Sequence, residues 1–183
     1  MYIADSDNER LQLAKRRLLS LGAPVEAFHG EAATTAKLIR AKLDPYGLHF
    51  AFVDPYNLGA FDFSVVETLS KRKRIDMLVH ISKMDLQRNT WLNVQAQESA
   101  FDKFVPGWRS AVDLNQPYNA IRRAVFDLWK TKVVNLGMAA STDMQLITGS
   151  RGQHLYWLTL AARHELALAF WKTATDSGQG ELF

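Results

Sequence analysis

The chain of 183 residues contains no cysteine. Disulfide bonds, thiolate zinc sites, iron–sulfur ligation and a cysteine nucleophile are therefore excluded. The sequence also lacks any run approaching the roughly 18 apolar residues of a membrane span. Residues 1–7 are acidic and lack the basic region with which a secretory signal begins. These absences predict a cytoplasmic protein without a membrane partner.

Several catalytic and ligand-binding signatures are missing as well. The sequence has no P-loop and no Gly-x-Ser-x-Gly motif, and its only Gly-x-Gly, at residues 178–180, follows no predicted strand. The five histidines show no metal-ligand spacing, so no metal is expected. A net charge of +3 permits a nucleic-acid partner without requiring one. The basic run at residues 71–74 is more typical of a solvated helix end than of a nucleic-acid patch.

What is present is an ordinary globular composition arranged as alternating strands and helices. Hydrophobic residues make up 48% of the chain, which is enough apolar mass for one domain spanning residues 1–183. Strand-sized apolar runs occur at residues 2–4, 24–28, 49–53 and 75–81. Helical patterns separate these runs at residues 9–21, 32–43 and 63–70. The alternation predicts an α/β protein, a Rossmann-like three-layer sandwich around a parallel sheet.

Local signals predict how individual elements begin, end and pack. Asp7 is the expected N-cap of the first helix, and Gly22 is placed to end that helix. The run at residues 49–53 is nearly all apolar, which is typical of a strand buried on both faces.

The second half of the chain is less regular. Helices are predicted at residues 84–100, 118–134 and 165–175, with an inserted loop at residues 104–117. Strands are predicted at residues 138–148 and 155–162, joined by the glycine-containing residues 149–152. Two strands joined by so short a turn predict an antiparallel hairpin at one edge of the sheet.

The sharpest candidate site is Asp54-Pro55-Tyr56-Asn57, directly after an apolar strand. In open parallel sheets, ligands bind beyond the carboxyl ends of the strands. The Asp54 carboxylate and the Pro55 carbonyl suit an exocyclic amine, and the Tyr56 ring offers a stacking surface. The alternative is a plain turn, because residues 44–47 repeat Asp-Pro-Tyr in a sequence typical of a turn.

Acidic residues follow the first two predicted strands. Asp5 ends the first strand, and Glu31 follows the second after a glycine. An acid at such a position can accept hydrogen bonds from ribose hydroxyls. The alternative for this region is structural, with Asp7 as a helix cap and Glu31 in a solvated loop.

Taken in order, these motifs resemble the three-Cys-motif partner family, whose members look like S-adenosylmethionine (SAM)-dependent methyltransferases. The resemblance runs from about residue 1 to residue 183 and rests on residues 52–56, 61–63, 73–78, 87–89, 164–172 and 178–183. The family takes its name from a neighbouring protein with three cysteines, which is itself similar to radical-SAM enzymes. No defined reaction comes with the family.

The resemblance implies roles for residues at the strand ends. Asp5 matches the ribose-binding acid, and Glu31 matches the acid near the adenine. Asp54, Pro55 and Tyr56 match the motif at the methyl-transfer site. The remaining implied residues line the same crevice or contact substrate: Asn57, His80, Ser82, Arg88 and Asn89.

One departure from the methyltransferase pattern stands out. Such enzymes begin with a strand and a glycine-rich loop that holds the methionine part of SAM, whereas this chain begins at the second strand. The sheet of these enzymes has the strand order 3-2-1-4-5-7-6, so the missing strand is strand 1, which lies at the centre. We therefore expect strands 2 and 4 of that order either to pair directly or to have another segment between them. We also expect the chain to be a truncated version of a longer protein.

Two functions follow as hypotheses. The first is a SAM-dependent methyltransferase that acts on a nucleobase or a similar amine. The second is a non-catalytic Rossmann-like module that binds the three-Cys, radical-SAM-like protein or nucleic acid.

Overall fold

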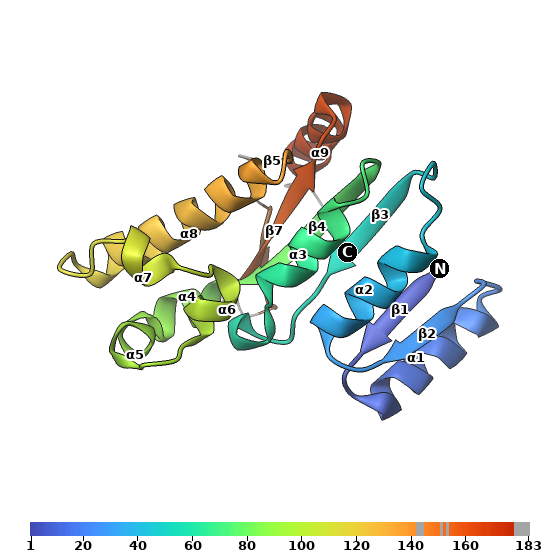
Figure 1. Ribbon diagram of the computed structural model, residues 1–183, viewed down its shortest axis with the longest axis horizontal. Helices are drawn as coiled ribbons and strands as arrows, with labels where there is room; N and C mark the ends of the chain where they lie inside the picture. The colour runs from blue at the N-terminus through green and yellow to red at the C-terminus, as the bar shows by residue number, and fades with distance from the viewer. Residues whose placement is uncertain (142–144, 151, 153, 178–183) are drawn as a thin grey trace. The chain divides into compact units, whose positions relative to one another are not determined.

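The computed structural model describes residues 1–141, 145–150, 152 and 154–177. It divides into two compact units. The N-terminal unit comprises residues 1–47 and 64–72, and the C-terminal unit comprises residues 48–63 and 73–183. Helices and strands occur in both units, so the α/β class predicted from the sequence is confirmed (Figure 1).

The N-terminal unit is built on a pair of parallel strands. Its elements are β1 (Tyr2–Asp5), α1 (Asn8–Ser20), β2 (Glu26–His29), α2 (Ala32–Lys42) and most of α3 (Phe63–Ser70). Strand β1 lies parallel to β2, with Asp5 opposite His29. The carboxyl ends of both strands therefore lie at one edge of this unit (Figure 1).

Short-range hydrogen bonds fix both ends of α1 as predicted. The Asp7 carboxylate accepts the backbone N–H groups of Glu9 at 2.9 Å and Arg10 at 3.1 Å. These bonds satisfy two of the amide groups that a helix leaves unpaired at its start. At the other end Gly22 adopts a φ of +77°, and its N–H donates to the Leu19 carbonyl. Glycine adopts this left-handed conformation without steric cost.

The C-terminal unit contains the larger sheet and most of the helices. Its strands are β3 (His49–Val53), β4 (Ile75–Ser82), β5 (Ala139–Ala140), β6 (Gln145–Thr148) and β7 (His154–Ala162). Its helices are the 3₁₀ turn η1 (Leu58–Ala60), α4 (Lys83–Arg88), α5 (Thr90–Gln95), α6 (Ala100–Phe104), α7 (Trp108–Ala111), α8 (Tyr118–Asn135) and α9 (Glu165–Ser177).

The sheet of the C-terminal unit has the strand order β3-β4-β7-β5. Strand β7 links its parallel part to its antiparallel part. Strands β3 and β4 are parallel, and β7 runs antiparallel to β4. Strands β5 and β6 pair with successive parts of β7, with Leu146 of β6 opposite Trp157. The predicted antiparallel hairpin is therefore confirmed. Its first arm consists of two strands rather than one, and residues 142–144 lie outside the described part.

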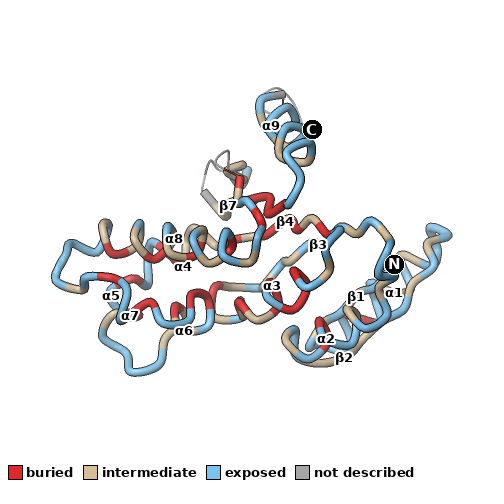
Figure 2. The backbone as a smooth tube through the Cα atoms, turned by 45° about the horizontal axis from the view of Figure 1, so that its top comes forward, coloured by how far each residue is buried: buried red, intermediate tan, exposed pale blue. Residues whose placement is uncertain are grey.

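The core of the C-terminal unit lies on one face of its sheet. Met77, Val79 and Ile81 alternate along β4 and are fully buried (Figure 2). An aromatic cluster adds to this core: Phe104 lies 5.2 Å from Phe61 and 6.0 Å from Trp129, measured between ring centroids. Trp129 lies on α8, as the helical spacing of that segment predicts.

The loop predicted at residues 104–117 is wrong where α7 forms, and the helix predicted at residues 84–100 is confirmed as α4 and α5, although it is interrupted. The first segment contains α7, and its Val105 and Trp108 are fully buried. Gly107, with φ +80°, turns the chain between α6 and α7. In the second segment the helix ends at Asn89 and again at Ala96. Burial of large side chains therefore outweighs the proline and glycine signals that predicted a loop.

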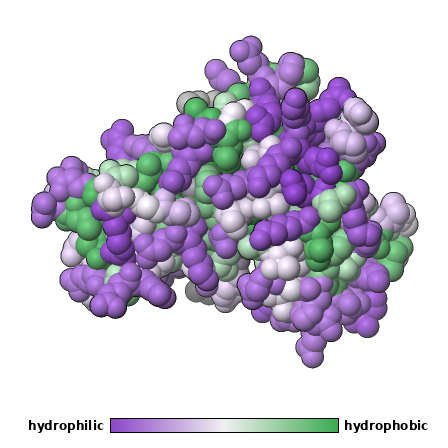
Figure 3. Space-filling view, in the orientation of Figure 1, coloured by the Kyte–Doolittle hydropathy of each residue, from purple (hydrophilic) through white to green (hydrophobic). Residues whose placement is uncertain are grey.

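The prediction that β3 is buried on both faces is wrong as well. Phe50 and Phe52 are largely exposed, whereas the intervening Ala51 is half-buried. Strand β3 is the edge strand of its sheet, so only β4 pairs with it among the described residues. Apolar side chains also reach the surface elsewhere on the molecule (Figure 3).

Neither expectation about the missing central strand holds within the described residues. Strand β1 pairs with β2 alone, and β3 pairs with β4 alone, so they belong to separate sheets. No other described segment pairs with either strand. Across this same part of the chain, no helix has both the length and the apolar character needed to cross a bilayer.

Candidate functional site

A carboxylate and an imidazole meet at the carboxyl end of the parallel pair β3–β4. Val53 lies opposite Val79 in the register, so Asp54, the next residue, lies beside His80. The Asp54 Oδ1 and His80 Nδ1 atoms are 2.5 Å apart. The Asp54 side chain is 57% exposed and the His80 side chain is 14% exposed. The acid therefore faces solvent while the imidazole lies against the sheet.

This contact determines which ring nitrogen of His80 remains available. An ionised carboxylate only accepts hydrogen bonds, so His80 Nδ1 carries the proton and donates it to Asp54. The other nitrogen, Nε2, is then left to exchange protons with a ligand. Carboxylate–imidazole pairs in many enzymes orient a histidine base in this way. Asp54 Oδ2 forms no hydrogen bond with the described residues and is available to a ligand donor.

Tyr156 of β7 completes the surroundings of His80. Its ring centroid lies 4.0 Å from that of the imidazole, with the two planes tilted by 50°. Tyr156 pairs with Ser82 across β4 and β7, which puts it on the same face of the sheet as His80. Tyr156 was not among the site residues predicted from the sequence. Alternation within residues 154–162 was a usable signal, but only the antiparallel register reveals what Tyr156 contacts.

The other residues after β3 are either exposed or hydrogen-bonded to neighbouring segments. Tyr56 is exposed, as a stacking ring requires, and Pro55 lies beside it. Asn57 instead caps η1, because its Oδ1 accepts the Ala60 N–H at 2.8 Å. The next residue, Leu58, donates its N–H to Asp85 Oδ2 at 2.9 Å. The loop is therefore tied to α4.

The residues predicted after β4 lie along α4. Ser82 is the N-cap of that helix, and its Oγ accepts the Asp85 N–H at 3.3 Å. Arg88 is exposed in the last turn, and Asn89 ends the helix while its carbonyl accepts the side-chain N–H of Asn93. The structure therefore brings together Asp54 and His80, with Ser82 at the end of the same strand. Arg88 and Asn89 lie at the opposite end of α4.

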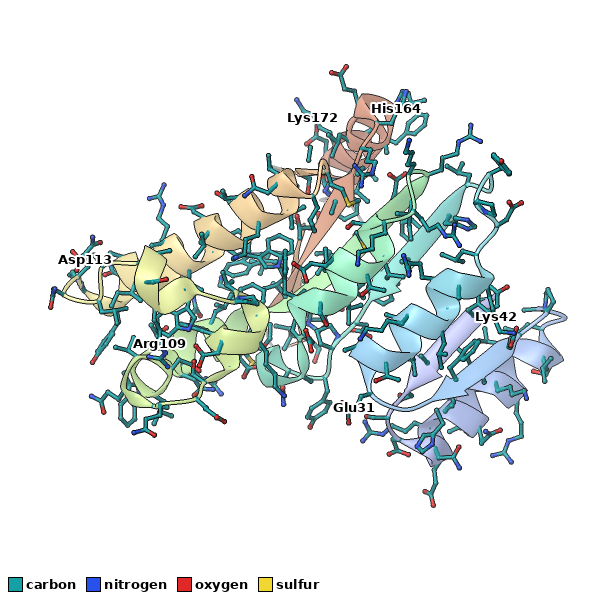
Figure 4. The ribbon with its side chains drawn as sticks, in the orientation of Figure 1. Glu31, Lys42, Arg109, Asp113, His164 and Lys172 are labelled. Carbon is teal, nitrogen blue, oxygen red and sulfur yellow. The ribbon has the colours of Figure 1, made fainter. Side chains whose placement is uncertain are left out.

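In the N-terminal unit, the two predicted acids share one edge of the β1–β2 pair. Asp5 Oδ1 accepts the Asp7 N–H at 2.8 Å, and the Asp5 carbonyl accepts the Gly30 N–H at 3.1 Å. Glu31 is exposed at the start of α2, and its side chain makes no capping hydrogen bond (Figure 4). One oxygen of Asp5 is thus used locally, whereas the Glu31 carboxylate is directed to solvent.

An ion pair lies at the other end of the same unit. Lys42 Nζ is 2.6 Å from Glu26 Oε1, where β2 begins. The hydrogen bond and charge of Glu26 raise the pKa of Lys42. This pair is therefore remote from the acidic edge formed by Asp5 and Glu31.

Within the described ranges, no group of three or more histidine, aspartate and glutamate side chains is arranged to hold a metal ion. The site chemistry is instead that of hydrogen-bond acceptors, one imidazole and exposed aromatic rings.

The comparisons with known proteins add one distant structural similarity. No family model and no curated protein matches the chain. A matching solved structure is titled the crystal structure of PH0226 protein from Pyrococcus horikoshii OT3. The two are 12% identical, with a TM-score of 0.40, and the match covers 88% of this chain and 70% of the other.

Proposed function

We propose that the chain is a Rossmann-like component related to SAM-dependent methyltransferases, with an amine of a nucleobase or similar molecule as its substrate. The observation that carries this proposal is the hydrogen bond between Asp54 and His80 at the carboxyl end of β3 and β4. Ligand sites of open parallel sheets occur at such ends. The resemblance to the three-Cys-motif partner family supports the same assignment.

Residues of the N-terminal unit suit one part of the cofactor. The carboxylates of Asp5 and Glu31 are acceptors that fit ribose hydroxyls and the adenine amine. No glycine-rich loop following a strand occurs among the described residues to bind the methionine end. When bound, SAM supplies the methyl group.

In this proposal the C-terminal unit binds the substrate amine and accepts its proton. Asp54 Oδ2 and the Pro55 carbonyl accept hydrogen bonds from the amine, and the Tyr56 ring stacks on the base. The amine nitrogen gains a methyl group and loses one proton, which His80 Nε2 accepts. The Asp54 carboxylate stabilises the imidazolium that results. Positioning of the amine supplies a large share of the rate.

The test is incorporation of labelled methyl groups from SAM into oligonucleotides and free nucleosides that carry an exocyclic amine. Asp54→Asn and His80→Gln are expected to abolish transfer. Asp176→Asn, the same change at an exposed position of α9, is expected to leave it intact. Thermal unfolding of Asp54→Asn should stay within about 1 kcal/mol of the wild type, because the side chain is largely exposed and the asparagine oxygen can still accept the His80 N–H. Transfer at the wild-type rate by Asp54→Asn would remove Asp54 from the chemistry.

The non-catalytic binding module is the second candidate, and one observation favours it. Strands β1 and β3 each pair on one side only within the described residues, which leaves strand edges for another chain. A wild-type protein that transfers no methyl group, yet retains the three-Cys protein or a nucleic acid in a binding assay, would support this second function.

A further inference from the structure

The His80 imidazole has a partner on each side of its own strand. Asp54, which follows β3, accepts the His80 Nδ1–H at 2.5 Å. On the other side, the Tyr156 ring of β7 lies 4.0 Å from the imidazole, measured between ring centroids. The strand order β3-β4-β7 separates these two partners across β4. The imidazole is therefore held between a hydrogen bond and an aromatic ring.

The Tyr156 ring reaches His80 diagonally rather than straight across the strands. In the register of β4 and β7, Tyr156 lies opposite Ser82, whereas Leu158 lies opposite His80. Diagonal neighbours across an antiparallel pair have Cα atoms about 7–8 Å apart, a distance that aromatic side chains span. The contact with His80 therefore depends on how the Tyr156 side chain is directed, and not on the register alone.

A bulge in β7 lies directly beside Tyr156. Ile147 of β6 lies opposite Tyr156, and the next residue of β6, Thr148, lies opposite His154. Leu155 is thus an extra residue in β7. A bulge of this kind increases the local twist of a strand and redirects the neighbouring side chains, and bulges are frequent next to active sites. The backbone irregularity therefore lies at the position from which Tyr156 reaches the candidate site.

Packing of the ring, rather than a bond from the hydroxyl, accounts for this contact. The Tyr156 hydroxyl forms no hydrogen bond with the described residues. The Asp54 side chain is 57% exposed, so water competes for its oxygens and the hydrogen bond alone holds His80 weakly. The His80 side chain is only 14% exposed. The Tyr156 ring therefore restricts rotation of the imidazole away from Asp54.

We propose that Tyr156 is a positioning residue, which holds the His80 imidazole against Asp54 so that Nδ1 keeps its proton and Nε2 stays available to the substrate. Tyr156 acts through His80 and does not touch the reacting atoms. Functional sites require side chains whose rotamers are fixed by their neighbours. The face of a tyrosine ring also attracts the imidazolium that forms when Nε2 accepts a proton. The kinetic consequence of this inference rests on the proposed function, whereas the orientation of His80 does not.

The first test measures the state of the His80 ring and needs no methyl transfer. Long-range proton–nitrogen NMR spectra of the full chain, labelled at histidine, distinguish a protonated ring nitrogen from an unprotonated one, and His80→Gln identifies the His80 signals. At about pH 9, above the usual pKa of histidine, Nδ1 should carry the proton in the wild type. Tyr156→Ile, which keeps a residue suited to a strand, should lose this preference for Nδ1. Tyr156→Phe should retain it, because the ring remains.

The matched control is Tyr118→Ile, the same change at a tyrosine of α8 that is 48% exposed. It should leave the His80 signals unchanged. Circular dichroism and thermal unfolding verify that each variant is folded, and Tyr156→Leu replaces Tyr156→Ile if the latter does not fold.

The second test is steady-state methyl transfer by the same variants. Tyr156→Ile should lower kcat about 10–100-fold, because a misplaced base loses much of its contribution to the rate. The KM should change less than about twofold, since Tyr156 does not bind the substrate. Tyr156→Phe should recover the rate that Tyr156→Ile loses.

A proton that stays on Nδ1 in Tyr156→Ile overturns the proposal, whatever the activity of that variant. Loss of the Nδ1 preference in Tyr156→Phe overturns it as well, because the hydroxyl and not the ring would then be required. A raised KM at an unchanged kcat in Tyr156→Ile would make Tyr156 a substrate-binding residue and not a positioning one. A wild type that transfers no methyl group contradicts the proposed function alone, because the NMR spectra still decide the role of Tyr156.

Discussion

Trp108 donates its indole N–H to Asp102 Oδ1 at 2.7 Å, across the turn between α6 and α7. The other oxygen of Asp102 accepts the Ser99 N–H at 2.7 Å and caps α6. Arg109 lies beside the same carboxylate and donates to the Ala96 carbonyl at 2.6 Å (Figure 4). One acid thus holds the ends of α5, α6 and α7 together.

We expect Asp102→Asn to destabilise the protein by about 1–2 kcal/mol, because hydrogen bonds to a charged group are lost and solvent partly screens them. Burial tends to raise the pKa of Asp102, but hydrogen bonds from Ser99, Trp108 and Arg109 outweigh it and lower the pKa below 3.8. The stabilisation is therefore present above pH about 3.8 and is lost as the pH falls through the folded-state pKa. Urea unfolding of the wild type and the variant at pH 7 and at successively lower pH measures the loss of this difference.

Asp113→Asn is the control for that experiment. Asp113 is exposed (Figure 4), and among the described residues its carboxylate bonds only to the nearby Asn115 and Gln116. Its substitution should change stability less than that of Asp102. Equal effects of the two variants would contradict the connecting role of Asp102.

Asp76 should show the opposite dependence on pH. It lies on β4 opposite Phe50, and burial raises its pKa above 3.8, although the Arg163 N–H and the charge of His164 partly offset this. The folded state thus favours the protonated form of Asp76. The stability that this adds is present below pH about 3.8 and is lost as the pH rises through the folded-state pKa.

Asp76→Asn should therefore raise the free energy of unfolding at pH 7 by up to about 1 kcal/mol, a figure kept small because the side chain is partly exposed. At pH 3 and below, where both states are protonated, the variant and the wild type should unfold alike. Denaturant titrations at the two pH values test this. A loss of stability at pH 7 would show that the ionised carboxylate is stabilising.

Two glycines with the same backbone conformation should respond differently to alanine. Gly22 has φ +77° and Gly137 has φ +75°. A Cβ at Gly22 meets nothing within 4 Å, whereas one at Gly137 would lie 2.6 Å from Arg163 Nη1. That arginine donates to the Gly137 carbonyl at 2.8 Å.

Each substitution costs about 1 kcal/mol of left-handed strain. Gly137→Ala should cost about 1 kcal/mol more than Gly22→Ala, because Arg163 must move and its hydrogen bond is lost. Thermal unfolding of the two variants side by side gives the difference directly. The same loss in both would mean that Arg163 adjusts without cost.

Binding of SAM by the chain should be weaker than micromolar. Asp5 supplies a few hydrogen bonds, each contributing about 0.5–1.5 kcal/mol, or up to about 3 kcal/mol where a charge takes part. A micromolar constant requires about 8 kcal/mol, and one Asp5 oxygen is already bonded to the Asp7 N–H. Titration calorimetry with SAM measures the constant, and micromolar binding would mean that another loop holds the cofactor.

The elements that the sequence predicts well are those fixed by neighbouring residues. Asp7 and Gly22 act within one helical turn, so their roles can be inferred from local spacing. The burial of Trp108 could not be inferred, because the proline and glycine around it signal a loop and its partner Asp102 is a matter of folded geometry. Likewise, apolar composition alone did not indicate that Phe50 and Phe52 are exposed.

The candidate site also contains some features that sequence patterns predict and others that depend on the folded geometry. The order of parallel strands predicts that Asp54 and His80 share one edge of the sheet, and the structure gives the contact between them. Asn57 and Ser82 were inferred as crevice residues, but their side chains cap η1 and α4. Tyr156 depends on the register between β4 and β7, strands far apart in the chain. Sequence patterns do not specify such long-range registers.

The position of β7 determines the order in which the C-terminal unit can form. This strand comes late in the chain, yet it lies between β4 and the pair β5 and β6. During synthesis, β4 is made long before the strand that covers its edge, since Met77 must wait for Ala161. Closing so long a loop is slow, and an open β4 edge exposes apolar surface in the meantime. Folding of this unit is therefore expected to finish only after β7 has left the ribosome.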